Sequence, residues 1–180
     1  MQPTFKDMTN YIISLGAADI SHSDKSYLAH AIGVYNDMKA WGGNDDLCRA
    51  ALFHSIYGTQ GFQSFTLPVD RQPELRALIG DYAEKLAFAN CFMDRASLDA
   101  QIQKLEGPYP ITHRITGEQF VLSKSEYEDL IRLHLCDWLE QVPRAQLWDY
   151  RRDAYRQMAE RLGGVALTSY DRVFAQEAKA

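Results

Sequence analysis

Apolar residues along this chain recur at spacings of three and four, which is the period of an α-helix with one buried face. The first set is Phe5, Met8, Ile12 and Leu15, and Gly16 offers a natural end to that helix. The same periodicity predicts further helices over residues 24–41, 44–58, 75–93, 124–142, 148–162 and 169–178. The predicted fold class is therefore all-α.

Capping and breaking residues set the boundaries of these predicted helices. The glycine pair at 42–43 ends the second helix, and Asn44 is a good N-cap for the third. Gly80 marks a junction inside the segment 75–93. Ser123 can cap the helix that follows it, and Pro143 is expected to stop that helix.

Two segments depart from the helical pattern. Residues 111–122 predict a small β-hairpin that turns at 116–118. Residues 58–73 are irregular, with glycines and prolines, and a loop of this length is often functional. We find no internal repeat and no linker, so residues 1–180 are predicted to form one domain.

Composition and charge narrow the class of protein. The net charge of −5 disfavours nucleic acid as a partner, because phosphate binding needs a basic face. No apolar run is long enough for a membrane span, and no signal-peptide pattern is present. The cysteines Cys48, Cys91 and Cys136 lie in apolar helical patterns and are expected to be reduced core residues. We therefore predict a cytoplasmic protein without membrane contact.

Two histidines and one aspartate lie in apolar stretches, where a polar side chain is costly to bury without a partner. They are His30, His54 and Asp137. Each has a simpler interpretation as a core residue that hydrogen bonds satisfy, and His134 is spaced to pair with Asp137 on one helix face. Together, two imidazoles and a carboxylate on separate helices predict a metal site. No glycine-rich phosphate loop, G-x-S-x-G or H-E-x-x-H motif competes.

Several of these segments resemble HD-domain proteins. The segments YLAH at 27–30 and LCRAALFH at 47–54 are similar to the opening of that fold, in its alarmone (ppGpp) hydrolase branch. Residues 75–86 resemble the helix that follows the family's His-Asp pair, and LCDWL at 135–139 resembles the segment that supplies its final Asp. The likeness covers residues 20–142. It implies an HD-domain-like helical bundle with a small hairpin insertion, followed by C-terminal helices over 148–178.

The resemblance also implies which residues bind a metal. His30 and His54 match the two histidines of the family, and Asp137 matches its last aspartate. Ser55 stands where the family has the aspartate of its His-Asp pair, so both the ligand and the water-orienting role of that carboxylate are in doubt. The acidic pair that the alarmone hydrolases place shortly afterwards is replaced by Gly58 and Thr59.

The segment HSIYGT at 54–59 is similar to a variant found in an uncharacterised group of HD-like proteins. In that group His22 is part of the pattern, so the resemblance implies that His22 replaces the missing carboxylate as a ligand. Three imidazoles and one carboxylate suit Fe, Mn, Ni, Co or Zn better than Mg. The expected cofactor is one divalent transition metal ion.

Three functional hypotheses follow. The first is a metal-dependent hydrolase of a small phosphorylated or otherwise anionic metabolite, because a bound metal lowers the pKa of water and polarises a phosphoryl oxygen. Ser55 and Tyr57 would line its pocket, and Lys25, Arg71 or Arg95 would receive the substrate anion.

The second hypothesis is a degenerate, metal-free HD fold that serves as a binding or regulatory module. It expects a direct hydrogen bond between His30 and Asp137. The third is an iron-dependent oxygenase or another specialised-metabolism enzyme on the same scaffold. A fold by itself does not decide between these functions.

Overall fold

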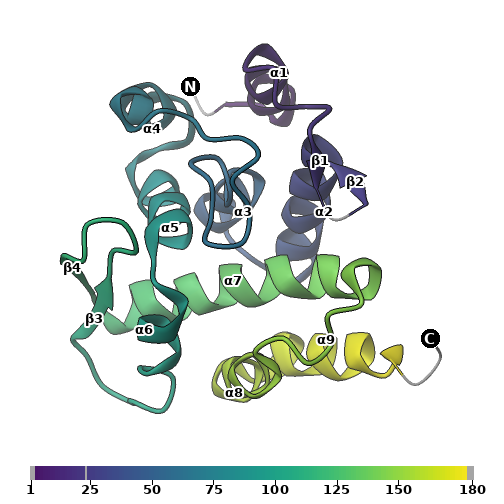
Figure 1. Cartoon of the computed structure of the whole chain (residues 1–180), viewed down its shortest axis with the longest axis vertical. Coiled ribbons are helices and arrows are strands. Elements are labelled where there is room, and N and C mark those ends of the chain that lie inside the picture. Colours follow the sequence, from purple (N-terminus) through teal and green to yellow (C-terminus); the bar gives the residue numbers. More distant parts are fainter. Residues whose placement is uncertain (1–2, 23, 178–180) are drawn as a thin grey trace.

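The computed structural model describes residues 3–22 and 24–177 and consists mainly of helices, with two small antiparallel hairpins (Figure 1). In chain order the elements are α1 (Phe5–Ser14), β1 (Ser21–His22), β2 (Lys25–Ser26), α2 (Tyr27–Ala40), α3 (Asp45–Leu52), α4 (Gln72–Ile79), α5 (Asp81–Phe92), α6 (Arg95–Asp99), β3 (Tyr109–Thr112), β4 (Gln119–Leu122), α7 (Lys124–Ala145), α8 (Arg152–Leu162) and α9 (Gly164–Phe174). A short 3-10 helix, Val69–Arg71, precedes α4. The mainly helical prediction is confirmed.

Helix α7 runs through the middle of the molecule (Figure 1). It packs against α2, α3 and α5 on one side and against α8 and α9 on the other. Because α7 has neighbours on both sides, its residues 133–140 are all buried, including two carboxylates, Asp137 and Glu140. A helix that is packed on both sides leaves such polar groups little contact with bulk water, so they need partners inside the protein.

The predicted caps are present. The side chain of Asn44 accepts a hydrogen bond from the backbone N–H of Leu47 at the start of α3. Ser123 and Glu126 form a reciprocal capping box at the start of α7. These caps satisfy backbone donors that have no partner within the helix.

Several helix boundaries differ from the prediction. Helix α2 begins at Tyr27 and not at residue 24, because β1 and β2 first form a hairpin whose turn includes Asp24 at φ 61°. Helix α3 ends at Leu52, ahead of an irregular turn. Helix α7 continues through Pro143 to Ala145, although the proline has no N–H to donate to the carbonyl oxygen of Leu139.

The C-terminal helices also begin elsewhere. Helix α8 begins at Arg152 and not at residue 148, because Arg151 adopts a left-handed conformation with φ 47°. Helix α9 spans Gly164–Phe174, whereas the prediction was 169–178; residue 178 lies outside the described residues.

The predicted hairpin is confirmed, with Ile111 opposite Phe120 in the β3–β4 register. All three cysteines are buried and unpaired, as expected. None of the helices among the described residues has the length and apolar character that crossing a bilayer requires.

Candidate metal centre

Three side chains from separate parts of the sequence meet in the interior. His30 comes from α2, His54 from the turn after α3, and Asp137 from α7. Nε2 of His30 lies 3.1 Å from Nε2 of His54 and 3.0 Å from Oδ1 of Asp137. Nε2 of His54 lies 3.3 Å from the same Oδ1, so the three atoms form a nearly equilateral triangle.

The other nitrogen of each imidazole is occupied. His30 Nδ1 contacts Oε2 of Glu140 at 2.5 Å, and His54 Nδ1 lies 2.8 Å from the backbone carbonyl oxygen of Ala51. Neither oxygen can donate a proton when Glu140 is ionised, so both Nδ1 atoms carry the hydrogen. When both rings are neutral, their Nε2 lone pairs point at each other and at a carboxylate, an arrangement that needs a shared cation.

This triangle has the dimensions of a metal site. Ligand atoms about 2.1 Å from one tetrahedral or octahedral ion lie about 3.0 to 3.4 Å apart. The three observed separations, from 3.0 to 3.3 Å, fall in that range. His30, His54 and Asp137 thus fit a transition metal ion as three protein ligands that leave further coordination positions open.

Glu140 supports the site from one turn further along α7. Its carboxylate bonds His30, accepts from Lys25 Nζ at 2.7 Å, and accepts from both terminal nitrogens of Arg144. Burial opposes ionisation of Glu140, but these hydrogen bonds outweigh it and lower its pKa to about 2. An ionised Glu140 fixes both the orientation and the tautomer of His30.

The electrostatics of the triangle follow from the same contacts. Burial disfavours the charged form of His30, but Asp137 and Glu140 raise its pKa to about 9. Burial also disfavours the charged form of Asp137, yet His54 and His30 hold its pKa well below the usual range. Asp137 is thus an anion that attracts a cation, either a metal ion or a proton on His30.

His22 lies beside the triangle and is not part of it. Its ring stacks on that of His30, with centroids 4.2 Å apart and planes 10° from parallel. Its Nδ1 is buried and has no hydrogen-bond partner among the described residues. Burial, and then the neighbouring His30, lower the pKa of His22 to about 4, so it is neutral at pH 7.

His134 does not pair with Asp137, although their spacing allowed it. Its Nδ1 lies 3.1 Å from Oδ1 of Asn90, and Arg151 approaches its Nε2 at 2.8 Å. Burial and Arg151 lower the pKa of His134, which therefore stays neutral. Asn90 in turn donates to the backbone carbonyl oxygen of His54 at 2.8 Å, so His134 and Asn90 hold the His54 backbone in place.

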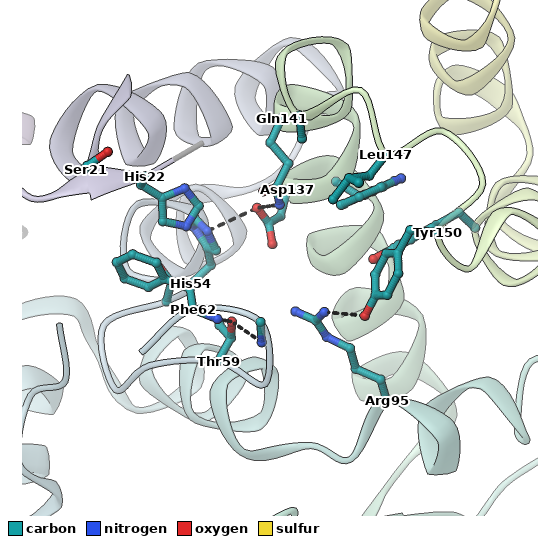
Figure 2. A pocket seen from close by; sticks show the side chains of 15 residues that line it. Ser21, His22, His54, Thr59, Phe62, Arg95, Asp137, Gln141, Leu147 and Tyr150 are labelled. Atoms are coloured by element: carbon teal, nitrogen blue, oxygen red, sulfur yellow. Dashed lines mark hydrogen bonds and ion pairs between the residues drawn. The ribbon is translucent and has the colours of Figure 1, made fainter. Parts of the chain in front are cut away.

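A cavity of about 380 Å³ opens beside the triangle (Figure 2). His54 and Asp137 line one wall, and the Arg95 guanidinium faces them from the opposite side (Figure 2). The other lining residues come from the β1 strand, the 54–62 turn and loop, the second half of α7 and the segment leading to α8; they are Ser21, His22, Ser55, Thr59, Gly61, Phe62, Trp138, Gln141, Ala145, Leu147, Tyr150 and Tyr155.

Of the other residues expected at the site, Ser55 lines the cavity. Tyr57 does not, because its hydroxyl points into the core and donates to Glu84 at 2.9 Å. Arg71 is at the surface, paired with Glu74. Lys25 pairs with Glu140 and so lies behind the candidate metal ligands and not in the cavity. Among the cations expected to receive the substrate, only Arg95 faces the cavity.

Sequence reasoning missed Glu140, Gln141 and Asn90. Glu140 follows Asp137 by three residues on one helix, a spacing that places both on the same face. It was therefore detectable as a second buried carboxylate. Gln141 donates to Oδ1 of Asp137 at 3.1 Å. The two residues are four apart on one helix, a spacing that also places their side chains on the same face. Nothing in the sequence around Asn90 indicated its role.

Comparisons with known proteins add one finding. A family model described as a domain of unknown function (DUF6817) matches residues 11–95. The matched stretch contains His22, His30, His54 and Arg95 and ends before Asp137. No curated protein and no solved structure matches the chain.

Proposed function

We propose that this protein is an HD-like, metal-dependent hydrolase of small phosphorylated or otherwise anionic molecules. The observation that carries the proposal is the convergence of two Nε2 lone pairs and one carboxylate oxygen, 3.0 to 3.3 Å apart, at the wall of a cavity. The order of these ligands along the chain is the order that the HD-domain resemblance implies, with His30 on α2, His54 in the turn after α3 and Asp137 on α7. A metal bound there would activate water and polarise a substrate oxygen.

The chain's own residues have distinct tasks in this proposal. Glu140 and the Ala51 carbonyl keep His30 and His54 in the ligating tautomer. Arg95 holds the substrate anion on the opposite side of the cavity. Asp137 is the only carboxylate among the described residues that line the cavity, and burial, which lowers the pKa of His22 to about 4, makes that imidazole a weak base.

A specific observation also favours the oxygenase as a second candidate. Two histidines and one carboxylate on one face of a metal, with open positions, form the ligand set of non-haem Fe(II) oxygenases. The two candidates differ in metal and co-substrate. Hydrolysis releases inorganic phosphate or another acid without O₂, whereas the oxygenase requires iron and consumes O₂.

The test is elemental analysis of protein purified without an affinity tag and without chelator. We expect about one equivalent of a divalent transition metal in the wild type, because a three-ligand site holds one ion. His54→Ala and Asp137→Asn should each lose the metal. His113→Ala is the matched control: His113 stacks on Phe92 at the hairpin, outside the triangle, and its removal should leave the metal content unchanged.

Metal-free wild-type protein whose melting temperature EDTA does not change would contradict the proposal. That result would favour the metal-free binding module. In it a protonated His30 bridges Asp137 and Glu140 directly, which the 3.0 Å contact between His30 Nε2 and Asp137 Oδ1 permits. Phosphate release from phosphomonoesters, compared with O₂ uptake by iron-loaded protein, then separates the two enzymatic candidates.

A further inference from the structure

The cavity has a single positive side chain. Among its lining residues in the described part of the chain, Arg95 is the only lysine or arginine. His54, on the opposite wall, is neutral when its Nε2 lone pair is directed at a metal ion and its Nδ1–H at the Ala51 carbonyl oxygen. The fixed positive charge available to an anion, apart from a metal, is therefore that of one guanidinium.

Among the described residues, the hydrogen-bond partners of Arg95 are neutral groups. Its side chain donates to the hydroxyl of Tyr150 at 2.7 Å, and its backbone N–H donates to Oε1 of Gln60 at 3.0 Å. The guanidinium lies against Gly61, where a Cβ would approach its nitrogens to 3.1 and 3.2 Å. A cation positioned by neutral groups at a cavity wall keeps its charge available for an incoming anion.

The wall beside Arg95 is aromatic and apolar. The rings of Trp138 and Tyr155 stack with centroids 5.1 Å apart, and Tyr150 packs on Trp138 at 5.2 Å. Leu147 also lines the cavity and is 57% exposed. Together these side chains form an apolar wall of the kind against which the apolar part of a small ligand packs.

We infer that the ligand of this cavity is a small organic molecule with a single anionic group and an aromatic or branched aliphatic body. The anionic group binds between Arg95 and the metal centre, and the body packs on the wall formed by Trp138, Leu147 and Tyr150. This inference rests on the proposed function and narrows its substrate. It excludes polyphosphates such as the alarmones, since several adjacent phosphates require several cations.

The test is equilibrium binding of four probes that do not turn over. Phenylphosphonate has both features, methylphosphonate lacks the body, benzyl alcohol lacks the charge, and pyrophosphate is a polyanion. Titrations use the protein as purified and the metal-depleted His54→Ala variant, in which pyrophosphate has no metal to chelate. We expect phenylphosphonate to bind about tenfold or more tightly than each of the others in both proteins.

Variants test separately the residue that binds the anionic group and a residue that packs on the apolar body. Arg95→Gln should weaken phenylphosphonate binding about tenfold or more and leave benzyl alcohol unchanged, because it removes a charge-assisted contact. Leu147→Ser should weaken phenylphosphonate and leave methylphosphonate unchanged. Arg71→Gln is the matched control, since Arg71 pairs with Glu74 at the surface, and should change nothing.

Tighter binding of pyrophosphate than of phenylphosphonate in the metal-depleted variant would overturn the inference. So would an Arg95→Gln variant that binds like the wild type, or no phenylphosphonate binding at all. If Arg95→Gln does not fold, Tyr150→Phe replaces it: loss of the hydroxyl that holds the guanidinium should weaken phenylphosphonate, and unchanged affinity overturns the inference. Metal content is measured separately, so failure of the proposed function is distinguishable from failure of this inference.

Discussion

At the scale of single residues, Gly33 shows how a missing side chain shapes the candidate metal centre. It lies in the interior of α2, where glycine costs about 1 kcal/mol relative to alanine. A Cβ at this position would lie 2.5 Å from Oε1 of Glu140. Glu140 has little freedom to move away, because Lys25, His30 and Arg144 all bond its carboxylate. The glycine therefore makes room for the group that orients His30.

Gly33→Ala is expected to destabilise the protein although alanine is the better helix former. The added methyl group must displace a carboxylate held by three partners, and overpacking of this kind costs about 1 to 3 kcal/mol. Chemical denaturation measures the change in the free energy of unfolding, and metal titration should show a weaker site.

The matched control is the same substitution in a Glu140→Ala background. With the carboxylate gone, Gly33→Ala should instead stabilise the protein by up to about 1 kcal/mol, through helix propensity alone. The same effect in both backgrounds would contradict the role assigned to Gly33.

At the scale of elements, α7 carries Asp137 and Glu140 and begins with a capping box. Ser123 accepts from the backbone N–H of Glu126, and the Glu126 carboxylate accepts from the backbone N–H of Ser123. We expect Ser123→Ala to lower the free energy of unfolding by about 1 kcal/mol, because it leaves a helix N–H without its acceptor. Thermal or urea denaturation measures the loss.

Ser125→Ala is the control for this cap. Ser125 lies two residues further along, is exposed, and contributes only a contact between its hydroxyl and that of Ser123. Its substitution should change stability by less than about 0.5 kcal/mol. Equal effects of the two variants would show that the cap does not stabilise α7. Metal content should be the same in both, because the cap is remote from the ligands.

At the scale of the whole molecule, one hydrogen-bond network connects the start of α8 to the candidate metal centre. Asp99 bonds Arg151 at 2.9 Å, Arg151 bonds His134, and His134 bonds Asn90, which donates to the backbone carbonyl oxygen of His54. These residues come from α5, α6, α7 and the start of α8. The position of His54 thus depends on helices far from it in the sequence.

Asn90→Ala should therefore destabilise the protein and weaken metal binding together. It leaves the Nδ1–H of His134 buried without its acceptor, at about 1 to 3 kcal/mol, and leaves the His54 carbonyl oxygen only the weaker thiol donor of Cys91. Denaturation and metal titration measure the two effects.

Gln103→Ala is the comparison for Asn90, since Gln103 also bonds through its amide but at the surface, with Gln157. Its substitution should change stability by less than about 0.5 kcal/mol and leave metal binding unchanged. If the Asn90→Ala variant is as stable as Gln103→Ala, the hydrogen-bond network does not hold His54 in position.

Much of the fold was predictable because it depends on local rules. Apolar periodicity indicates which face of a helix is buried, and Asn44 and Ser123 are caps whose partners lie three residues away. The boundaries that were wrong depend on contacts or conformations that no local pattern records. Helix α2 begins late because a short hairpin pairs residues 21–22 with 25–26, and α8 begins late because Arg151 is left-handed.

The sequence by itself determined which residue types are available to the site: His30, His54 and Asp137 stand in apolar stretches where each must find a partner. Only the tertiary structure decided which atoms meet, because a hydrogen bond or a metal contact depends on positions to within a few tenths of an ångström. It placed Glu140 behind His30, kept His22 beside the triangle, and turned Tyr57 into the core. Helix packing sets how deeply each side chain is buried and how far its atoms lie from their neighbours, and these two quantities give Glu140, His22 and Tyr57 their different roles.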